Sequence, residues 1–207
     1  RSTLLTSSAA SDVYKRLPNG CGKTTTIGMI LGLLKPTSGK VLINGIEIEK
    51  NRVQLLNNLN FISPYIELPK KLTVKQNLIV YGKLYDVKNL KTKIEYLTEK
   101  LRLDDIINKI TGELSSGQKN RVSLAKSIIN DPLVLLLDEP TASLDPETGD
   151  FVRSFFENYQ KEKGTSILLA SHNMSEVERL CSSVLMMNNG SIICLLYTSD
   201  AADEVRS

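Results

Sequence analysis

A run of five apolar residues that ends in two adjacent carboxylates is the feature that most restricts the fold of this chain. The run extends from Leu133 to Leu137 and is followed by Asp138 and Glu139. Its length and its continuous apolar character are typical of a strand buried on both faces, as in a parallel sheet covered by helices. In such sheets, ligands bind beyond the carboxyl ends of the strands. The sequence therefore predicts an α/β protein with a polar site at the end of this strand.

Segments of strand type and helix type alternate along the rest of the chain, as expected of a parallel α/β domain. Strands are predicted at 41–44, 59–62, 133–137, 166–170 and 184–187. Helices are predicted at 23–34, 146–161 and 174–180. In between, apolar residues recur with helical spacing over 73–85, 91–103 and 116–130. We therefore expect an α/β core with a helical subdomain inserted at about 68–130.

Composition narrows the class of protein. The 207 residues are 41% hydrophobic and 24% charged, which is ordinary for a globular domain. The net charge of +3, from 26 basic and 23 acidic residues, is too small to predict a nucleic-acid partner. No apolar run reaches the roughly 18 residues of a membrane-spanning helix, so we expect no direct membrane insertion. The 3 cysteines include no C-x-x-C pair, which favours a reducing, cytoplasmic compartment.

A segment rich in glycine and threonine lies directly before the first predicted helix. Its residues are Asn19, Gly20, Cys21, Gly22, Lys23, Thr24 and Thr25. A phosphate-binding loop needs glycines that let successive backbone N–H groups face one anion, and a helix N-terminus that faces the phosphates. The full pattern G-x-x-x-x-G-K-[ST] is incomplete, because Leu17 stands where its first glycine belongs. A plain turn before a threonine-rich helix would also explain the segment.

The polar residues of this segment have separate predicted tasks. Gly20 and Gly22 permit the turn. Lys23 would reach the β- and γ-phosphates of a nucleotide as a point charge, and Thr24 would place its hydroxyl on Mg²⁺. Thr25 would hydrogen-bond the α-phosphate at the start of the helix.

The adjacent carboxylates Asp138 and Glu139 suit two different tasks. Successive residues of a strand point to opposite sides. We expect Asp138 to support the Mg²⁺ shell and Glu139 to position and deprotonate a water molecule. An ordinary Asp-Glu-Pro turn after the strand is the alternative.

Two further polar groups follow predicted elements. The segment Leu114 to Gln118 begins a predicted helix, whose free N–H groups form an anion site, although helix capping alone would explain its serines. His172 is the only histidine and follows the strand predicted at 166–170. A neutral imidazole there could hydrogen-bond a γ-phosphate, and a structural role is the alternative.

Taken in order, these motifs resemble the nucleotide-binding domain of ATP-binding cassette (ABC) transporters. The residues that carry the resemblance are the Walker A loop Asn19 to Thr25, the signature Ser115, Ser116, Gly117 and Gln118, the Walker B run Leu133 to Glu139, the D-loop residue Asp145 and the switch histidine His172. The resemblance covers about 18–193. It implies a P-loop NTPase fold, in which Glu139 and His172 are catalytic and Thr24 and Asp138 hold the metal.

The resemblance also implies partners. Each ATP, with its Mg²⁺, would lie between the Walker A loop of one subunit and the signature of a second nucleotide-binding subunit, in a homo- or heterodimer. Closure on ATP and reopening after hydrolysis would drive a separate transmembrane permease. The chain would be cytoplasmic and peripheral on the inner face of the membrane. The segment Ser63 to Pro69, together with the signature, is most similar to exporter-type subunits from prokaryotes.

Two positions depart from the family pattern. The glutamine expected after the strand at 59–62 is absent, and Ser63 and Pro64 stand there instead. Ser116 occupies a signature position where glycine is usual, which is tolerated if its φ is negative.

The two ends differ from the middle of the chain. Residues 1–16 and 194–207 lack clear periodicity and resemble translated sequencing-adapter scars, so we expect a non-native or disordered leader and tail around a domain at 17–193. Ordinary mobile termini are the alternative. The strand that should lead into the phosphate loop is then missing, and we expect weak or no ATPase activity from this chain.

Two other functions fit part of the pattern. A non-transport ABC-type ATPase acting on ribosomes or DNA would share these motifs, but such proteins usually carry two cassettes or a long coiled coil, and neither is visible. A module that holds ATP without hydrolysing it is the second alternative. The presence of Glu139 argues against it.

Overall fold

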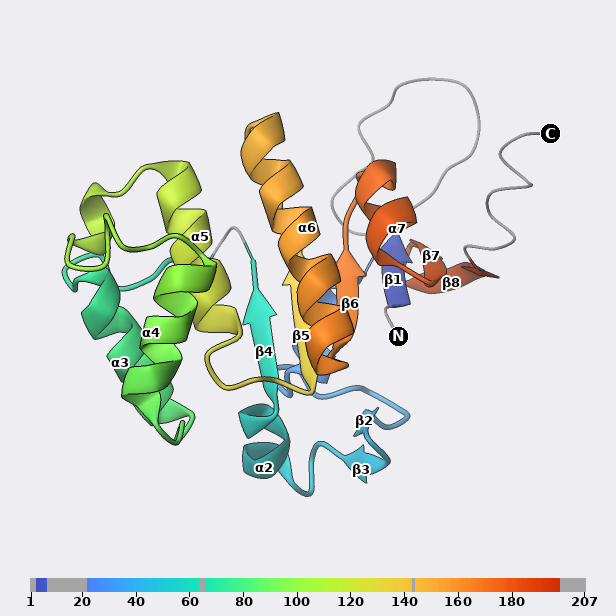
Figure 1. The fold of residues 1–207 in the computed structure, drawn as a ribbon. Helices are drawn as coiled ribbons and strands as arrows, with labels where there is room; N and C mark the ends of the chain where they lie inside the picture. The colour runs from blue at the N-terminus through green and yellow to red at the C-terminus, as the bar shows by residue number, and fades with distance from the viewer. Residues whose placement is uncertain (1–2, 7–21, 64–65, 143, 198–207) are drawn as a thin grey trace.

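The structure is a computed structural model that describes residues 3–6, 22–63, 66–142 and 144–197 (Figure 1). Its centre is a six-stranded sheet of order β4-β5-β6-β1-β7-β8. The strands are β1 Thr3–Thr6, β4 Leu59–Ile62, β5 Val134–Asp138, β6 Ser166–Ala170, β7 Ser183–Asn188 and β8 Ser191–Tyr197. All neighbouring pairs are parallel except β7 and β8, which form an antiparallel hairpin. The parallel α/β core predicted from the sequence is confirmed.

Helices cover both faces of this sheet. They are α1 Lys23–Ile30, α2 Arg52–Asn57, α6 Pro146–Lys163 and α7 Met174–Leu180. In Figure 1, α6 crosses the near face of the sheet and the small β2–β3 hairpin, Leu42–Ile43 with Ile46–Glu47, lies below it. Helix α1 ends at Ile30 instead of the predicted Leu34, because the chain turns at Gly32 with a φ of 63°. Helix α2 and strand β3 were not predicted, since six and two residues are too short to show a period.

Strand β5, which lies between β4 and β6, is buried on both faces, as its apolar run predicted. Leu135 and Leu137 belong to a large cluster that continues into α6 through Phe156, while Leu136 belongs to a second cluster with Ile27 of α1. All three leucines are fully buried. Two-sided burial explains why the run is continuous instead of alternating.

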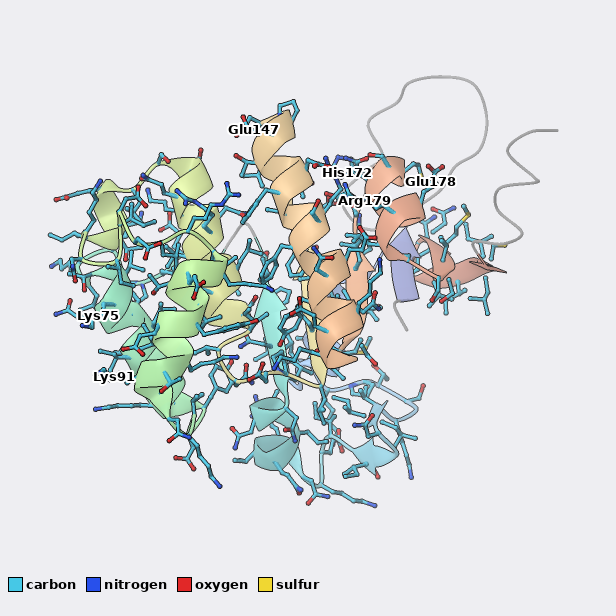
Figure 2. All side chains as sticks on the ribbon, viewed as in Figure 1. Lys75, Lys91, Glu147, His172, Glu178 and Arg179 are labelled. Carbon is cyan, nitrogen blue, oxygen red and sulfur yellow. The ribbon has the colours of Figure 1, made fainter. Side chains whose placement is uncertain are left out.

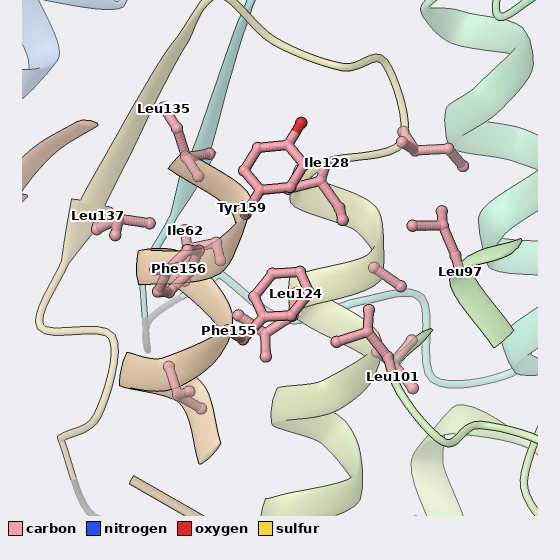
Figure 3. Close-up of a cluster of buried hydrophobic side chains, with 14 of the residues drawn as sticks. Ile62, Leu97, Leu101, Leu124, Ile128, Leu135, Leu137, Phe155, Phe156 and Tyr159 are labelled. Carbon is pink, nitrogen blue, oxygen red and sulfur yellow. The ribbon is translucent and has the colours of Figure 1, made fainter. Parts of the chain in front are cut away.

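The helical subdomain consists of α3 Val74–Leu84, α4 Leu90–Lys100, the short 3-10 turn η1 Thr111–Glu113 and α5 Ser116–Ser127. These helices stand together beside the sheet in Figure 1. Their apolar sides share the large cluster with the core, where Leu97, Leu101 and Leu124 lie near Phe155 and Phe156 (Figure 3). The predicted insertion is therefore present, but it is packed against the core through one continuous apolar layer.

The predictions for the chain ends are wrong at two places. Thr3–Thr6 forms β1, which pairs in parallel with both β6 and β7, although residues 1–16 were expected to add no strand. The first residues of the predicted tail, 194–197, belong to β8. A segment of four residues is too short to show the period of a strand in the sequence. Without β1, however, the backbone N–H and C=O groups of β6 and β7 that face each other would have no strand between them to bond. The expectation that the strand before the phosphate loop is missing is therefore not supported.

No helix among the described residues is long and apolar enough to cross a membrane.

Candidate functional site

Three predicted site residues meet at the carboxyl ends of β5 and β6. The Nζ of Lys23 lies 3.3 Å from Oε1 of Glu139, and Nδ1 of His172 lies 2.8 Å from Oε2 of the same carboxylate. The side chains of Lys23 and Glu139 are each 18% exposed, whereas that of His172 is 65% exposed. A single carboxylate is thus held between a cationic lysine and an imidazole at the edge of the sheet.

The backbone of Glu139 is in an unusual conformation. Its φ of 50° lies in the left-handed region, which costs a residue with a side chain about 1 kcal/mol. The Glu139 N–H still donates to the Ala170 carbonyl at 2.8 Å, and its own carbonyl accepts from the Ala142 N–H at 3.1 Å. This turn ends β5 at Asp138 and directs the Glu139 side chain toward Lys23 and His172.

Helix α1 presents an open N-terminus at the same edge. Gly22 precedes it with a φ of 102°, and among the described residues no side-chain hydrogen bond caps the helix at this N-cap position. The first N–H groups of a helix have no intrahelical partner, and their partial positive charge favours an anion. Thr24 and Thr25 are exposed in this turn. Lys23, Thr24 and Thr25 are therefore placed as a phosphate site requires, while Asn19, Gly20 and Cys21 lie outside the described residues.

Asp138 is buried beside Glu139, with 5% of its surface exposed. Burial, and then the neighbouring charge of Glu139, raise the pKa of its carboxyl. The hydroxyl of Ser63 donates to its Oδ2 at 3.5 Å. Ser63 stands where the family carries glutamine, so its contact with Asp138 is a part of the site that the sequence motifs did not indicate.

The donors at this edge fit a hard divalent cation. Carboxylate and hydroxyl oxygens are the ligands that Mg²⁺ prefers, and it usually keeps only one or two protein carboxylates beside phosphate and water. No group of three or more His, Cys, Asp or Glu residues suited to a metal occurs in the described part of the chain. The Asp138 carboxylate and the Thr24 hydroxyl are therefore of the ligand types that a cation bound together with phosphate requires.

The signature residues lie in a different cleft. Ser115 and Gln118 form a capping box at the start of α5: the Ser115 hydroxyl accepts from the Gln118 N–H at 3.3 Å, and the Gln118 Oε1 accepts from the Ser115 N–H at 3.0 Å. Ser116 begins the helix and has no positive φ, as the replacement of glycine requires. Gly117 faces α6, where an added Cβ would lie 3.5 Å from Thr148 Oγ1.

This cleft, of about 560 Å³, also contains the predicted D-loop residue. Asp145 caps α6 by accepting from the Thr148 N–H at 2.9 Å, and this backbone hydrogen bond lowers the pKa of its carboxyl. Arg102 and Arg121 line the cleft beside the signature residues. The cleft does not include Lys23 or His172, so one chain does not bring the signature to its own α1 N-terminus.

A second cleft, of about 320 Å³, runs between the helical subdomain and the end of β5. Ser63, Glu139 and Pro140 line it from the core, and Ser116 and Asn120 line it from α5. The Asn120 side chain donates to the Pro140 carbonyl at 3.3 Å. The helix that carries the signature is therefore bonded directly to the residue after Glu139.

Comparison with known proteins agrees with this arrangement. The sequence profile of the ABC transporter family matches residues 18–142, more than half of the chain. NatA, an ABC transporter ATP-binding protein of Bacillus subtilis (strain 168), is 33% identical over 195 residues, covering 90% of this chain and 79% of NatA. The Nod factor export ATP-binding protein I of Rhizobium johnstonii is 37% identical over 186 residues, covering 88% of this chain. The chain spans 59% of that relative's length.

Solved structures show the same fold. The cbiO1 subunit of Clostridium perfringens, described as part of the ABC transporter complex cbiONQ, superposes with a TM-score of 0.80 at 27% identity, over 98% of this chain and 80% of that chain. A dimeric ATP-binding cassette bound to ADP and Pi has a TM-score of 0.80 at 20% identity, over 95% of this chain and 84% of that chain, a likeness of fold. The chain belongs to the ABC transporter family, as an ATP-binding subunit of the ABC ATPase type.

Proposed function

We propose that this subunit hydrolyses ATP at the Lys23–Glu139–His172 cluster and so energises export through a separate transmembrane permease. The observation that carries the proposal is the Glu139 carboxylate, which lies within 3.3 Å of Lys23 and 2.8 Å of His172 at the end of a buried parallel strand. Export is favoured over import by the similarity to the Nod factor export ATP-binding protein I.

Binding of the triphosphate begins at α1. The open N–H groups after Gly22 would donate hydrogen bonds to the phosphate oxygens, and the Lys23 ammonium supplies a full positive charge. In the structure, the Lys23 ammonium is paired with the Glu139 carboxylate. The β- and γ-phosphates carry more negative charge than one carboxylate, so we expect Lys23 to exchange Glu139 for phosphate when ATP binds.

This exchange prepares Glu139 to act as a base. Once Lys23 binds phosphate, the Glu139 oxygen that it held is free to accept a proton of water. His172 keeps hold of Oε2 and orients the carboxylate. An imidazolium donates from both ring nitrogens, so in that form His172 can give its Nδ1–H to Glu139 and its Nε2–H to the γ-phosphate.

We further assign the metal site to Asp138 and the Thr24 hydroxyl. Mg²⁺, when bound, would neutralise charge on the phosphates. Ser63 orients Asp138 by its hydrogen bond to Oδ2. Asp138 is buried, and its carboxylate oxygens suit a metal ligand. The role of general base is assigned to Glu139 instead.

The partner of this site is a second nucleotide-binding subunit, identical or homologous. Because Ser115, Ser116, Gly117 and Gln118 line a cleft apart from Lys23, they are available to a nucleotide held by another subunit. Asp145 lies in the same cleft and would face that interface. A separate transmembrane permease completes the transporter. Its contact with the permease holds this subunit at the cytoplasmic side of the membrane.

The test is phosphate release from Mg-ATP by the purified chain, with Glu139→Gln beside the control Glu178→Gln. Glu178 is exposed on α7 (Figure 2). We expect Glu139→Gln to lose roughly a hundredfold or more in turnover while it retains binding of a fluorescent ATP analogue, because the amide cannot take a proton. Unchanged turnover in Glu139→Gln would refute the base assignment.

A further inference from the structure

A buried carboxylate joins the two loops that carry Glu139 and His172. Glu176, in the first turn of α7, is 1% exposed and accepts hydrogen bonds from two hydroxyls. Ser171 donates to its Oε2 at 2.6 Å, and Thr141 donates to its Oε1. Ser171 directly precedes His172, and Thr141 lies two positions after Glu139. We propose that Glu176 is a positioning residue that sets the distance between Glu139 and His172.

On the histidine side, Glu176 acts through Ser171. The Ser171 side chain is fully buried, and its Oγ also accepts from the Asn173 N–H at 3.0 Å. The serine hydroxyl thus closes a turn around His172. The imidazole is 65% exposed, so packing alone does little to hold it. Its position depends on the backbone that Ser171 and Glu176 fix.

On the glutamate side, Glu176 acts through Thr141. Glu139 leaves β5 with a left-handed φ, and a strained conformation persists only where its surroundings over-determine it. Thr141 follows that turn, and the hydrogen bond from its hydroxyl to the Glu176 carboxylate holds the backbone in place there. One carboxylate therefore anchors both loops, with one oxygen for each.

The surroundings of Glu176 show that stability is not its main contribution. Burial raises the pKa of its carboxyl; the Ser171 hydroxyl and the charges of Arg153 and His172 oppose this, and the charge of Glu139 adds to it. Burying a carboxylate with two neutral hydroxyls as its donors is unfavourable compared with burying a neutral amide of the same shape. Glu176→Gln should therefore fold at least as well as the natural chain.

The first experiment, which rests on the proposed ATPase activity, measures kcat and KM for ATP. We expect Glu176→Ala to lower kcat about tenfold to a hundredfold, with KM within about threefold, since the phosphate-binding residues are untouched. Glu176→Gln should recover most of kcat, because the amide oxygen accepts from one hydroxyl and the amide NH₂ can donate to the oxygen of the other. The exposed Glu178→Ala is the matched control on the same helix. A folded Glu176→Ala with natural kcat would overturn the proposal.

A double-mutant cycle separates positioning from a general loss of stability. If Glu176 sets the position of His172 relative to Glu139, the loss of kcat in His172→Ala/Glu176→Ala should be clearly smaller than the product of the two single losses. Multiplicative effects of the two changes would contradict the proposal. Thr141→Val removes only one of the two hydroxyls, and it should also lower kcat. It serves in place of Glu176→Ala if that variant does not fold.

The second experiment does not need turnover. Because His172 is the only histidine, the imidazole signals in an NMR spectrum of the histidine-labelled chain belong to it alone. We expect the hydrogen-bonded Nδ1–H signal to be present in the natural chain and in Glu178→Ala, and to be broadened or lost in Glu176→Ala. An unchanged signal in Glu176→Ala would overturn the positioning role. If neither the natural chain nor any variant hydrolyses ATP, but the signal is still lost in Glu176→Ala, the proposed ATPase function fails and the positioning role of Glu176 stands.

Discussion

The Nδ1 atom of His172 lies 2.8 Å from Oε2 of Glu139, so the one histidine of the chain is bonded to the carboxylate that follows β5. Both residues stand at carboxyl ends of neighbouring parallel strands, since Asp138 pairs with Ala170 in the sheet. The contact therefore follows from the register of β5 and β6, and it holds the proposed base in one orientation.

Replacing His172 should reduce turnover more than ATP binding. His172→Ala removes the group that orients Glu139, and we expect kcat to fall about a hundredfold while KM changes little. Steady-state phosphate release over a range of ATP concentrations measures both. A large rise in KM with natural kcat would show instead that His172 serves ground-state binding.

Replacing Gly22 should weaken nucleotide binding. Its φ of 102° is unfavourable for any residue with a side chain, and a Cβ would lie 3.2 Å from Gly190 Cα and 3.3 Å from Met187 Cε. We expect Gly22→Ala to bind a fluorescent ATP analogue at least tenfold more weakly. Gly39→Ala is a control for the backbone effect, because its φ is 82° and nothing lies near its Cβ position. Equal affinity in Gly22→Ala would contradict the assigned anion site.

Truncating Phe156 should destabilise the whole chain. Its side chain is fully buried where the sheet, α6 and the helical subdomain meet (Figure 3). Phe156→Ala should cost about 3–5 kcal/mol in the free energy of unfolding, measured by urea denaturation. Val53→Ala, at a position that is 77% exposed, should cost less than about 0.5 kcal/mol. Separate unfolding of the helical subdomain in Phe156→Ala would argue against one continuous core.

Lys126 should make stability depend on pH in the alkaline range. It packs between α5 and β4, where its Nζ donates to Asn60 Oδ1 at 2.9 Å and to the Phe61 carbonyl at 3.2 Å, and burial lowers its pKa to about 8. The unfolded chain, with an ordinary lysine pKa of about 10.4, binds more protons between these two values. Stability should therefore rise, by about 1–2 kcal/mol, as pH increases from about 8 to about 10.

Urea unfolding of the natural chain and of Lys126→Met at several pH values tests this. The difference between the two free energies isolates Lys126 from other groups that titrate in the same range. Lys75→Met, on the exposed side of α3 (Figure 2), is the control and should not change the slope. If the free energy of unfolding of Lys126→Met still rises between about pH 8 and pH 10, another titrating group causes the rise.

The amino-acid sequence by itself determined the class of fold and the chemistry of the site. Local patterns carry this: the apolar run of β5 requires two covered faces, and the glycines before Lys23 with the acids at the end of β5 predict a phosphate and a cation as ligands. The helical periods of α3, α5 and α6 were long enough to be recognised, with their ends displaced by a few residues.

Tertiary structure decided what depends on pairing between distant segments. Thr3–Thr6 is a strand only because β6 and β7 offer hydrogen bonds on both sides of it. Two contacts join loops that no sequence motif connects. One is the hydrogen bond of Ser63 to Asp138, and the other is the bridge from Glu176 to Thr141 and Ser171. Such contacts depend on sheet register and helix packing, which are set by the burial of the whole core and not by neighbours in sequence.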